Sequence, residues 1–348
     1  MGEWNAMTVT ETELIPVLDV GRYLAGDHRA GEGLARQLQL ALEQIGFFFV
    51  VNHGLDWQLV DETYRQAARL HALPDAVKEG LVMGPDSGGY LRLGGGTSYA
   101  SAIAGAVRKP NLNAAYFVHR DVQPGRNHWP DLPGFRDNVL AYFAAMERLA
   151  DRLLPLYALS LDLPADWFAP HFRPASCTLR MSHYPLVPHE QDQWGLAPHP
   201  DSTFMTLLPA NDVPGLEIRP QRALVKCPPM SQRALVKCPP MSQGHEWIAP
   251  PPLEQSFLVN SGDILRRWTN DAFLSTAHRV RNQSGRDRYA IPFFYGPRND
   301  ALIEALPTCV GSDNPPRYEP ITNGDYQRWF RNRNYASYTG EEAGPEAP

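Results

Sequence analysis

Three residues of the chain have the types and spacing of a metal site: His199, Asp201 and His278. In an extended strand, residues two apart point to the same side, so the imidazole and the carboxylate of His199-Pro200-Asp201 can face one point. His278 comes much later, within another β-branched run that reads as a strand. Two imidazoles and one carboxylate leave the other positions of a metal open, which is the ligand set expected of a non-haem Fe(II) oxygenase.

The chain contains a second H-x-D triplet, His119-Arg120-Asp121, so the pattern alone is weak evidence. That copy runs into the turn-like Val122-Gln123-Pro124-Gly125 and has no matching downstream group, so we expect a solvated loop there. The copy at 199–201 leads instead into 202–208, a run with strand composition. The sequence context therefore favours 199–201 as the metal-binding triplet.

The composition bounds the protein class: 348 residues, 43% hydrophobic and a formal net charge of −6 fit a globular chain with a substantial core. There is no basic footprint for nucleic acid and no apolar run of membrane-spanning length. Because Met1-Gly2-Glu3-Trp4 begins no signal peptide, we expect a cytoplasmic protein. Of the four cysteines, Cys227 and Cys238 belong to a duplication, so we expect reduced thiols rather than a disulfide framework.

The helices that must support the site lie in the first half of the chain. Apolar residues at helical spacing predict them near 30–45, 57–72 and 134–161. Gly46 is expected to end the first. Pro155 lies inside the third, and we expect it to kink or split that helix because proline removes a backbone donor and clashes with the preceding turn.

The strands are concentrated in the second half. Earlier strands are predicted at 15–19, 47–51 and 111–117, and the glycine-rich 84–110 reads as a mobile loop beside the last of them. From Cys177 onward, short strands separated by Pro, Gly and Asn are typical of a jelly-roll barrel. We place the barrel at 176–297.

An exact tandem repeat interrupts this barrel, since QRALVKCPPMS occurs at 221–231 and again at 232–242. Two identical copies cannot both occupy one barrel register, and their Pro-Pro pairs would interrupt a central strand. We therefore expect an extruded loop between strands near 215–218 and 245–248. Long surface insertions of this kind cost little stability.

Further motifs accompany the triplet. They are Ile15–Asp19, Gly46–Gly54, Asn260-Ser261-Gly262-Asp263, Trp268-Thr269-Asn270, His278-Arg279-Val280 and Arg288-Tyr289-Ala290-Ile291-Pro292-Phe293-Phe294. In this order and spacing they resemble the isopenicillin N synthase-like branch of the 2-oxoglutarate- and Fe(II)-dependent oxygenases. The resemblance covers roughly residues 14 to 337.

The resemblance implies a mostly β fold with flanking helices: a double-stranded β-helix (jelly-roll) barrel with an N-terminal α/β segment and a C-terminal helix. It also implies four parts, which are an N-terminal non-haem dioxygenase-type domain at 13–120, a linking helical segment at 121–175, the Fe(II)/2-oxoglutarate dioxygenase jelly roll at 176–297 with the repeat 221–242 inserted, and a C-terminal helix and tail at 298–348.

The resemblance assigns roles to five residues. His199, Asp201 and His278 would hold Fe(II) as the catalytic centre, leaving positions for the 1-carboxylate and 2-keto oxygens of 2-oxoglutarate and for O₂. Arg288 would grip the distal carboxylate of 2-oxoglutarate with two parallel hydrogen bonds. Tyr184 matches a family tyrosine that reaches the same carboxylate; alternatively, it is only a core aromatic of the barrel.

One position departs from the family pattern. Ala290 stands where the family usually has Ser or Thr, two residues after the arginine, so a hydroxyl that could bond the carboxylate is missing. Either another donor or water replaces it, or 2-oxoglutarate binds more weakly.

The leading function is therefore an oxygenase that couples oxidative decarboxylation of 2-oxoglutarate to hydroxylation, desaturation or cyclisation of a small molecule, for example in secondary metabolism. One alternative is an Fe(II) oxidase of the same fold that uses O₂ without 2-oxoglutarate. Another is a non-catalytic barrel used for binding. No nucleic-acid or membrane partner is expected, and the sequence leaves the substrate, the outcome and the oligomeric state open.

Overall fold

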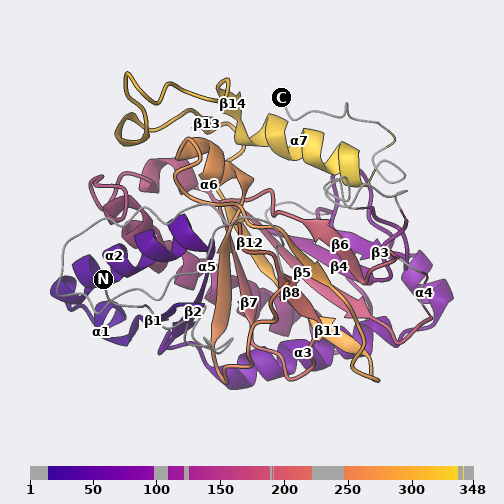
Figure 1. Ribbon diagram of the computed structural model, residues 1–348. Helices are drawn as coiled ribbons and strands as arrows, with labels where there is room; N and C mark the ends of the chain where they lie inside the picture. Colours follow the sequence, from indigo (N-terminus) through magenta and orange to yellow (C-terminus); the bar gives the residue numbers. More distant parts are fainter. Residues whose placement is uncertain are drawn as a thin grey trace, which may run out of the picture.

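The computed structural model describes residues 15–97, 109–120, 125–188, 190, 192–221, 247–335 and 340. In this part of the chain, two β-sheets lie at the centre, with long helices packed against one side (Figure 1). This arrangement confirms the predicted mostly β fold with flanking helices. The tandem repeat beyond Gln221 and the tail at 341–348 lie outside the described residues.

The larger sheet contains nine strands. In spatial order they are β1 (Val17–Asp19), β2 (Phe47–Val51), β9 (Phe257–Ser261), β7 (Met205–Pro209), β12 (Phe293–Gly296), β5 (Ser176–Tyr184), β4 (Ala114–His119) and β3 (Gly89–Leu91), with β11 (Arg288–Ala290) also paired to β5. The smaller sheet has the order β6 (Leu196–His199), β10 (His278–Val280) and β8 (Leu216–Ile218). A short antiparallel pair, β13 (Leu302–Ile303) and β14 (Ile321–Thr322), lies outside the barrel.

Seven α-helices flank these sheets in the described residues. They are α1 (Gly21–Leu24), α2 (His28–Gln44), α3 (Trp57–His71), α4 (Asp75–Glu79), α5 (Phe135–Leu159), α6 (Asp263–Trp268) and α7 (Asn323–Asn334). Two 3₁₀ turns, Ala169–Phe172 and Pro307–Cys309, complete the set. In Figure 1, α7 lies across one end of the barrel, so the predicted C-terminal helix is present and covers the barrel mouth.

Local chemistry explains where the first helices begin and end. The carboxylates of Asp27 and Asp56 accept from backbone N–H groups at the starts of α2 and α3, which satisfies donors that have no helical partner. Gly46 follows α2 with φ +72°, a conformation that favours glycine. A Cβ there would lie 2.9 Å from the carbonyl oxygen of Leu274, so glycine also allows the barrel to approach α2 closely.

Three sequence predictions about local structure are wrong in whole or in part. Pro155 lies inside α5, which continues as one helix from Phe135 to Leu159, so of the predicted kink or split the split does not occur. The buried face of this helix, which includes Met146, Leu153 and Tyr157, packs in the main core. The strand predicted at 111–117 is shifted toward the C-terminus, and β4 ends at His119.

The third difference concerns the other H-x-D triplet. His119 is the half-buried last residue of β4 rather than part of a solvated loop, and its Nδ1 lies 3.0 Å from the hydroxyl of Thr178. Arg120 forms a salt bridge with Glu147. Asp121 lies outside the described residues. The triplet therefore begins on a strand of the main sheet, which its polar letters and the following turn pattern concealed.

β5 separates the core from the barrel interior by the alternation of its side chains. Cys177, Leu179 and Met181 point into the main core, whereas the alternate positions, Thr178, Arg180, Ser182 and Tyr184, face the cavities of the barrel. Cys177 and Cys309 are free thiols, and burial raises the pKa of Cys177 well above its usual range. No helix of the described residues is both long and apolar enough to cross a membrane.

Candidate active site

The smaller sheet brings the two histidines of the predicted metal site together. His199 ends β6, His278 begins β10, and the two are direct partners in the antiparallel register. The carboxylate Oδ1 of Asp201 lies 3.8 Å from Nε2 of His199 and 3.6 Å from Nε2 of His278. One ligand atom from each residue lies within 4.8 Å of the others, so a single ion can reach all three.

Hydrogen bonds around the triad leave Nε2 of both histidines free to bind a metal. Nδ1 of His199 lies 2.8 Å from the carbonyl of Ala197, and Nδ1 of His278 lies 3.2 Å from that of Thr276. Because a carbonyl only accepts, each Nδ1 carries the proton and each Nε2 keeps its lone pair. This is the outer-shell pattern that orients histidine ligands.

Asp201 is oriented in the same way. Its Oδ2 accepts hydrogen bonds from the Thr206 hydroxyl at 2.6 Å and from the Asn260 amide at 2.7 Å, while Oδ1 faces the imidazoles. Burial acts to raise its pKa, but the two histidines and these hydrogen bonds hold the pKa of Asp201 below its usual value. Burial lowers the pKa of His199, so its imidazole is neutral. A carboxylate with two imidazoles that each present Nε2 is a ligand set that fits Fe(II).

A small inner cavity adjoins the triad and contains the other predicted residues. Arg288 on β11 and Tyr184 on β5 are backbone partners in the antiparallel register. The guanidinium carbon of Arg288 lies 5.2 Å from the centre of the Tyr184 ring. Arg288 is 3% exposed, its Nε donates to the carbonyl of Val213 at 3.2 Å, and its Nη1 has no hydrogen-bond partner. No carboxylate of the described residues pairs with it. This cavity therefore contains a buried cation without a counter-ion.

Ser182 also faces this inner cavity, and sequence reasoning missed it. It is fully buried, its hydroxyl has no hydrogen-bond partner, and it is the direct register partner of Ala290. A signal was available, because Ser182 precedes Tyr184 by two residues and must share its strand face. The position opposite Ala290 could not be read without the pairing of β11 with β5.

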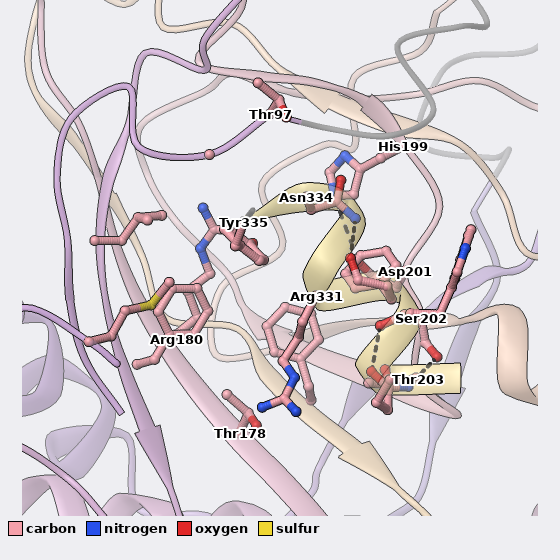
Figure 2. Close-up of a pocket in the computed structure, with 18 of the residues that line it drawn as sticks. Thr97, Thr178, Arg180, His199, Asp201, Ser202, Thr203, Arg331, Asn334 and Tyr335 are labelled. Atoms are coloured by element: carbon pink, nitrogen blue, oxygen red, sulfur yellow. Dashed lines mark hydrogen bonds and ion pairs between the residues drawn. The ribbon is translucent and has the colours of Figure 1, made fainter. Parts of the chain in front are cut away.

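A larger outer cavity of about 370 Å³ also borders His199 and Asp201. Its walls come from the segment at 83–97, which includes β3, from β4 and β5, and from α7. This segment and the helix are joined by a hydrogen bond from the backbone N–H of Thr97 to the carbonyl of Asn334. Figure 2 shows Arg180 and Arg331 among the side chains of this cavity, with His199 and Asp201 at its edge.

Comparisons with known proteins agree with this geometry. Residues 175–297 match the family model of the 2OG-Fe(II) oxygenase superfamily, and residues 15–132 match that of the N-terminal domain of the non-haem dioxygenases in morphine synthesis. Kihadalactone A synthase LFS of Citrus sinensis is 31% identical over 312 residues, which cover 84% of this chain and 85% of the relative. The 2-oxoglutarate-Fe(II) type oxidoreductase hxnY of Emericella nidulans is 28% identical, covering 92% and 90%.

Solved structures show the same fold. A full-length Neurospora crassa protein, crystallised in complex with alpha-KG and thymine, has a TM-score of 0.75 and 25% identity, covering 92% of this chain and 97% of that one. JOX2 in complex with 2OG, Fe and JA has a TM-score of 0.73 and 27% identity, covering 96% and 86%.

The family excludes the non-catalytic alternative and favours 2-oxoglutarate over an oxidase that does without it. The fold, the His-Asp-His cluster and the matched family models lead to one conclusion: the chain belongs to the 2-oxoglutarate-Fe(II) oxygenase superfamily and is a non-haem dioxygenase that uses Fe(II), 2-oxoglutarate and O₂.

Proposed function

We propose that His199, Asp201 and His278 hold the Fe(II) of this enzyme, and that Arg288 with Tyr184 and Ser182 holds the distal carboxylate of 2-oxoglutarate. When bound, Fe(II) and 2-oxoglutarate would together activate O₂, and 2-oxoglutarate would be converted to succinate and CO₂. We also propose the domain division of the sequence, with the site inside the jelly roll at 176–297.

The buried, unpaired guanidinium of Arg288 carries the proposal for 2-oxoglutarate. Removing a cation from water is costly unless an anion and hydrogen bonds replace the water. In the inner cavity the distal carboxylate would supply both, accepting from Nη1 of Arg288, an atom with no partner in the described residues. The cavity also borders His199 and Asp201, so one small dianion could reach the metal and Arg288 together.

Ser182 offers a replacement for the hydroxyl missing at Ala290. In an antiparallel pair, opposite residues project to the same face, and the two positions here are direct partners. A hydroxyl from β5 can therefore reach the space that a hydroxyl from β11 would occupy in the family pattern. The departure at Ala290 then changes the strand that supplies the donor, while the donor itself is retained.

The proposed reaction is hydroxylation, desaturation or cyclisation of a small molecule, with a place in secondary metabolism and in the cytoplasm. Relatives support the substrate class, since they include Kihadalactone A synthase and Azadirone synthase, and solved neighbours contain thymine or JA. An outer cavity of about 370 Å³ is within the range of small-molecule sites.

The direct test is a titration of 2-oxoglutarate into the anaerobic Fe(II) protein, followed through its metal-to-ligand charge-transfer absorption. We expect a saturable band with one Fe(II) per chain, and succinate formation when O₂ is admitted. Stoichiometric Fe(II) without the band would contradict the proposed co-substrate site.

The exchange of donors between β5 and β11 gives a sharper test. Ser182→Ala is expected to weaken 2-oxoglutarate binding by about two- to tenfold, about 0.5–1.5 kcal/mol for a neutral donor. Adding Ala290→Ser should restore most of the affinity, whereas Ala290→Ser alone should change it little. Ser176→Ala, on the same face of β5 but outside the inner cavity, is the control. A double variant as weak as Ser182→Ala would show that the two positions are not interchangeable.

A further inference from the structure

The outer cavity has more positive than negative charge. Its acidic side chains are Asp201, which belongs to the metal site, and Asp263, which accepts from the Tyr326 hydroxyl at 2.9 Å and lies 3.7 Å from Nε of Arg266. Two other guanidinium groups, those of Arg180 and Arg331, also line the cavity, and Arg180 borders the inner cavity as well. Among the described residues, no buried carboxylate forms an ion pair with either of these two arginines.

Arg180 is the more deeply buried of the two, with 7% of its surface exposed. Its Nη2 donates to Oδ1 of Asn113 at 2.7 Å, and its guanidinium lies over the Phe117 ring at 5.4 Å. These contacts fix the position of the group without neutralising it. Its Nε is buried and has no hydrogen-bond partner. Arg180 therefore has a spare donor and an uncompensated charge at the cavity wall, between Thr178 and Ser182 on the inward face of β5.

Arg331 adds a second positive charge from α7. One of its nitrogens donates to the carbonyl of Pro85 at 3.2 Å, and its nearest carboxylate, that of Asp86, is 3.8 Å away and 86% exposed. An exposed pair at this distance contributes little. Arg331 also acts electrostatically on His119. Burial lowers the pKa of His119 to about 3, and the positive charges of Arg126 and Arg331 contribute to this shift. His119 is thus neutral and adds no charge of its own.

The charges of the loaded site indicate which kind of group is still needed to balance the two arginines. In the loaded enzyme the two positive charges of Fe(II) match the two negative charges of 2-oxoglutarate, and Asp201 matches Arg288. Neither co-substrate nor metal leaves a negative charge for Arg180. Because an unpaired charge in an apolar, partly closed site is costly, the remaining binding partner is expected to be an anion.

From these observations, and on the basis of the proposed function, we infer that the primary substrate is a small organic carboxylate with an apolar body, whose carboxylate is bound by Arg180 with Arg331 as a second cation. The apolar body would pack on the aromatic and aliphatic walls, which include Phe117, Leu196, Phe294, Trp329 and Tyr335. The planar guanidinium suits a carboxylate, since it can donate two parallel hydrogen bonds.

The test uses a panel of aromatic and alicyclic monocarboxylates, beginning with 3-phenylpropanoate, each beside its primary amide of nearly the same shape. Binding is measured without O₂ on the Fe(II)-2-oxoglutarate protein, by ligand-observed NMR and by the near-infrared circular dichroism of Fe(II). We expect the acids that bind to do so at least about tenfold more tightly than their amides, as a charged hydrogen-bonding partner contributes. Arg180→Gln should remove most of this preference, while Arg180→Lys should keep part of it.

Variants on one helix separate the charge of the cavity from that of the surface. Arg331→Gln should reduce the preference for acids by a smaller factor, and Arg328→Gln should not change it, because Arg328 lies on α7 outside the cavity and pairs with Asp325. Amides that bind as tightly as acids would overturn the inference, as would a panel in which no acid binds. If the protein still shows the charge-transfer band, either of these two results overturns the inference and leaves the proposed function intact. Absence of the band in the parent protein contradicts the proposed function itself.

Discussion

Asp201→Ala is expected to reduce succinate formation at least about a thousandfold, the largest effect of any single substitution we propose. The carboxylate is the only anionic member of the His-Asp-His cluster, and a metal ion stabilises charge in the reaction by several kcal/mol, which is lost if the ion is not held. His199→Ala and His278→Ala should lose turnover as well. Asp201→Glu should also fail, because the extra methylene displaces the oxygen that faces the two imidazoles.

Metal content and stability decide whether this loss arises at the metal. Fe(II) per chain should fall in the variants, and the rise in unfolding temperature that Fe(II) gives the parent protein should disappear. Asp212→Ala is a matched control, since Asp212 is an exposed carboxylate that pairs only with Arg286 among the described residues. Stoichiometric Fe(II) with near-normal turnover in Asp201→Ala would remove this residue from the proposed ligand set.

Arg288→Ala is expected to weaken 2-oxoglutarate binding by about 2–4 kcal/mol, or roughly thirtyfold to nearly a thousandfold. The co-substrate would lose both a charged partner and a directional donor at a buried position. Arg288→Lys should recover only part of the affinity, because an ammonium group keeps the charge but not the fork of donors. Affinity is measured through the charge-transfer band of the anaerobic Fe(II) protein.

The fold should tolerate this change, because Arg288 lacks a carboxylate partner in the described residues and its removal leaves no buried anion exposed. Fe(II) binding and the unfolding temperature without 2-oxoglutarate should therefore remain close to those of the parent protein. Arg286→Ala is the control from the same segment, since Arg286 is exposed and pairs with Asp212. An unchanged affinity in Arg288→Ala would place the distal carboxylate elsewhere.

Sequence reasoning succeeded where the controlling interactions are local. The helical spacing of apolar residues located α2, α3 and α5, and the strand-like run at Phe47–Val51 is β2 as predicted. The same reasoning brought His199, Asp201 and His278 into one hypothesis, and the structure places them together. The helices, the strand and the His199-Asp201 pair depend on residue type and on spacings of a few positions, whereas His278, 77 residues after Asp201, was joined to the pair by its residue type and its strand-like context.

It failed where packing against distant elements decides the outcome. Pro155 was expected to kink or split α5, yet the helix is not split there, since its buried face packs in the main core. His119 was assigned to a loop because its triplet runs into a turn-like segment, although pairing with Thr178 on β5 extends the strand to it. The roles inferred for Ser182 and Arg180 required the register between strands and the shape of the cavities, which no single stretch of sequence contains.

The side chains on the inward face of β5 are evenly spaced along the site. Tyr184, Ser182, Arg180 and Thr178 follow one another at two-residue steps of about 6.6 Å, so the strand runs from the co-substrate end of the barrel to the outer cavity in regular intervals. Thr178 lines the outer cavity alone, whereas Arg180 borders both cavities. A designer who wished to admit longer molecules could therefore vary position 178 and leave 182 and 184 alone, and an exchange at 180 would have to be checked for retained 2-oxoglutarate binding.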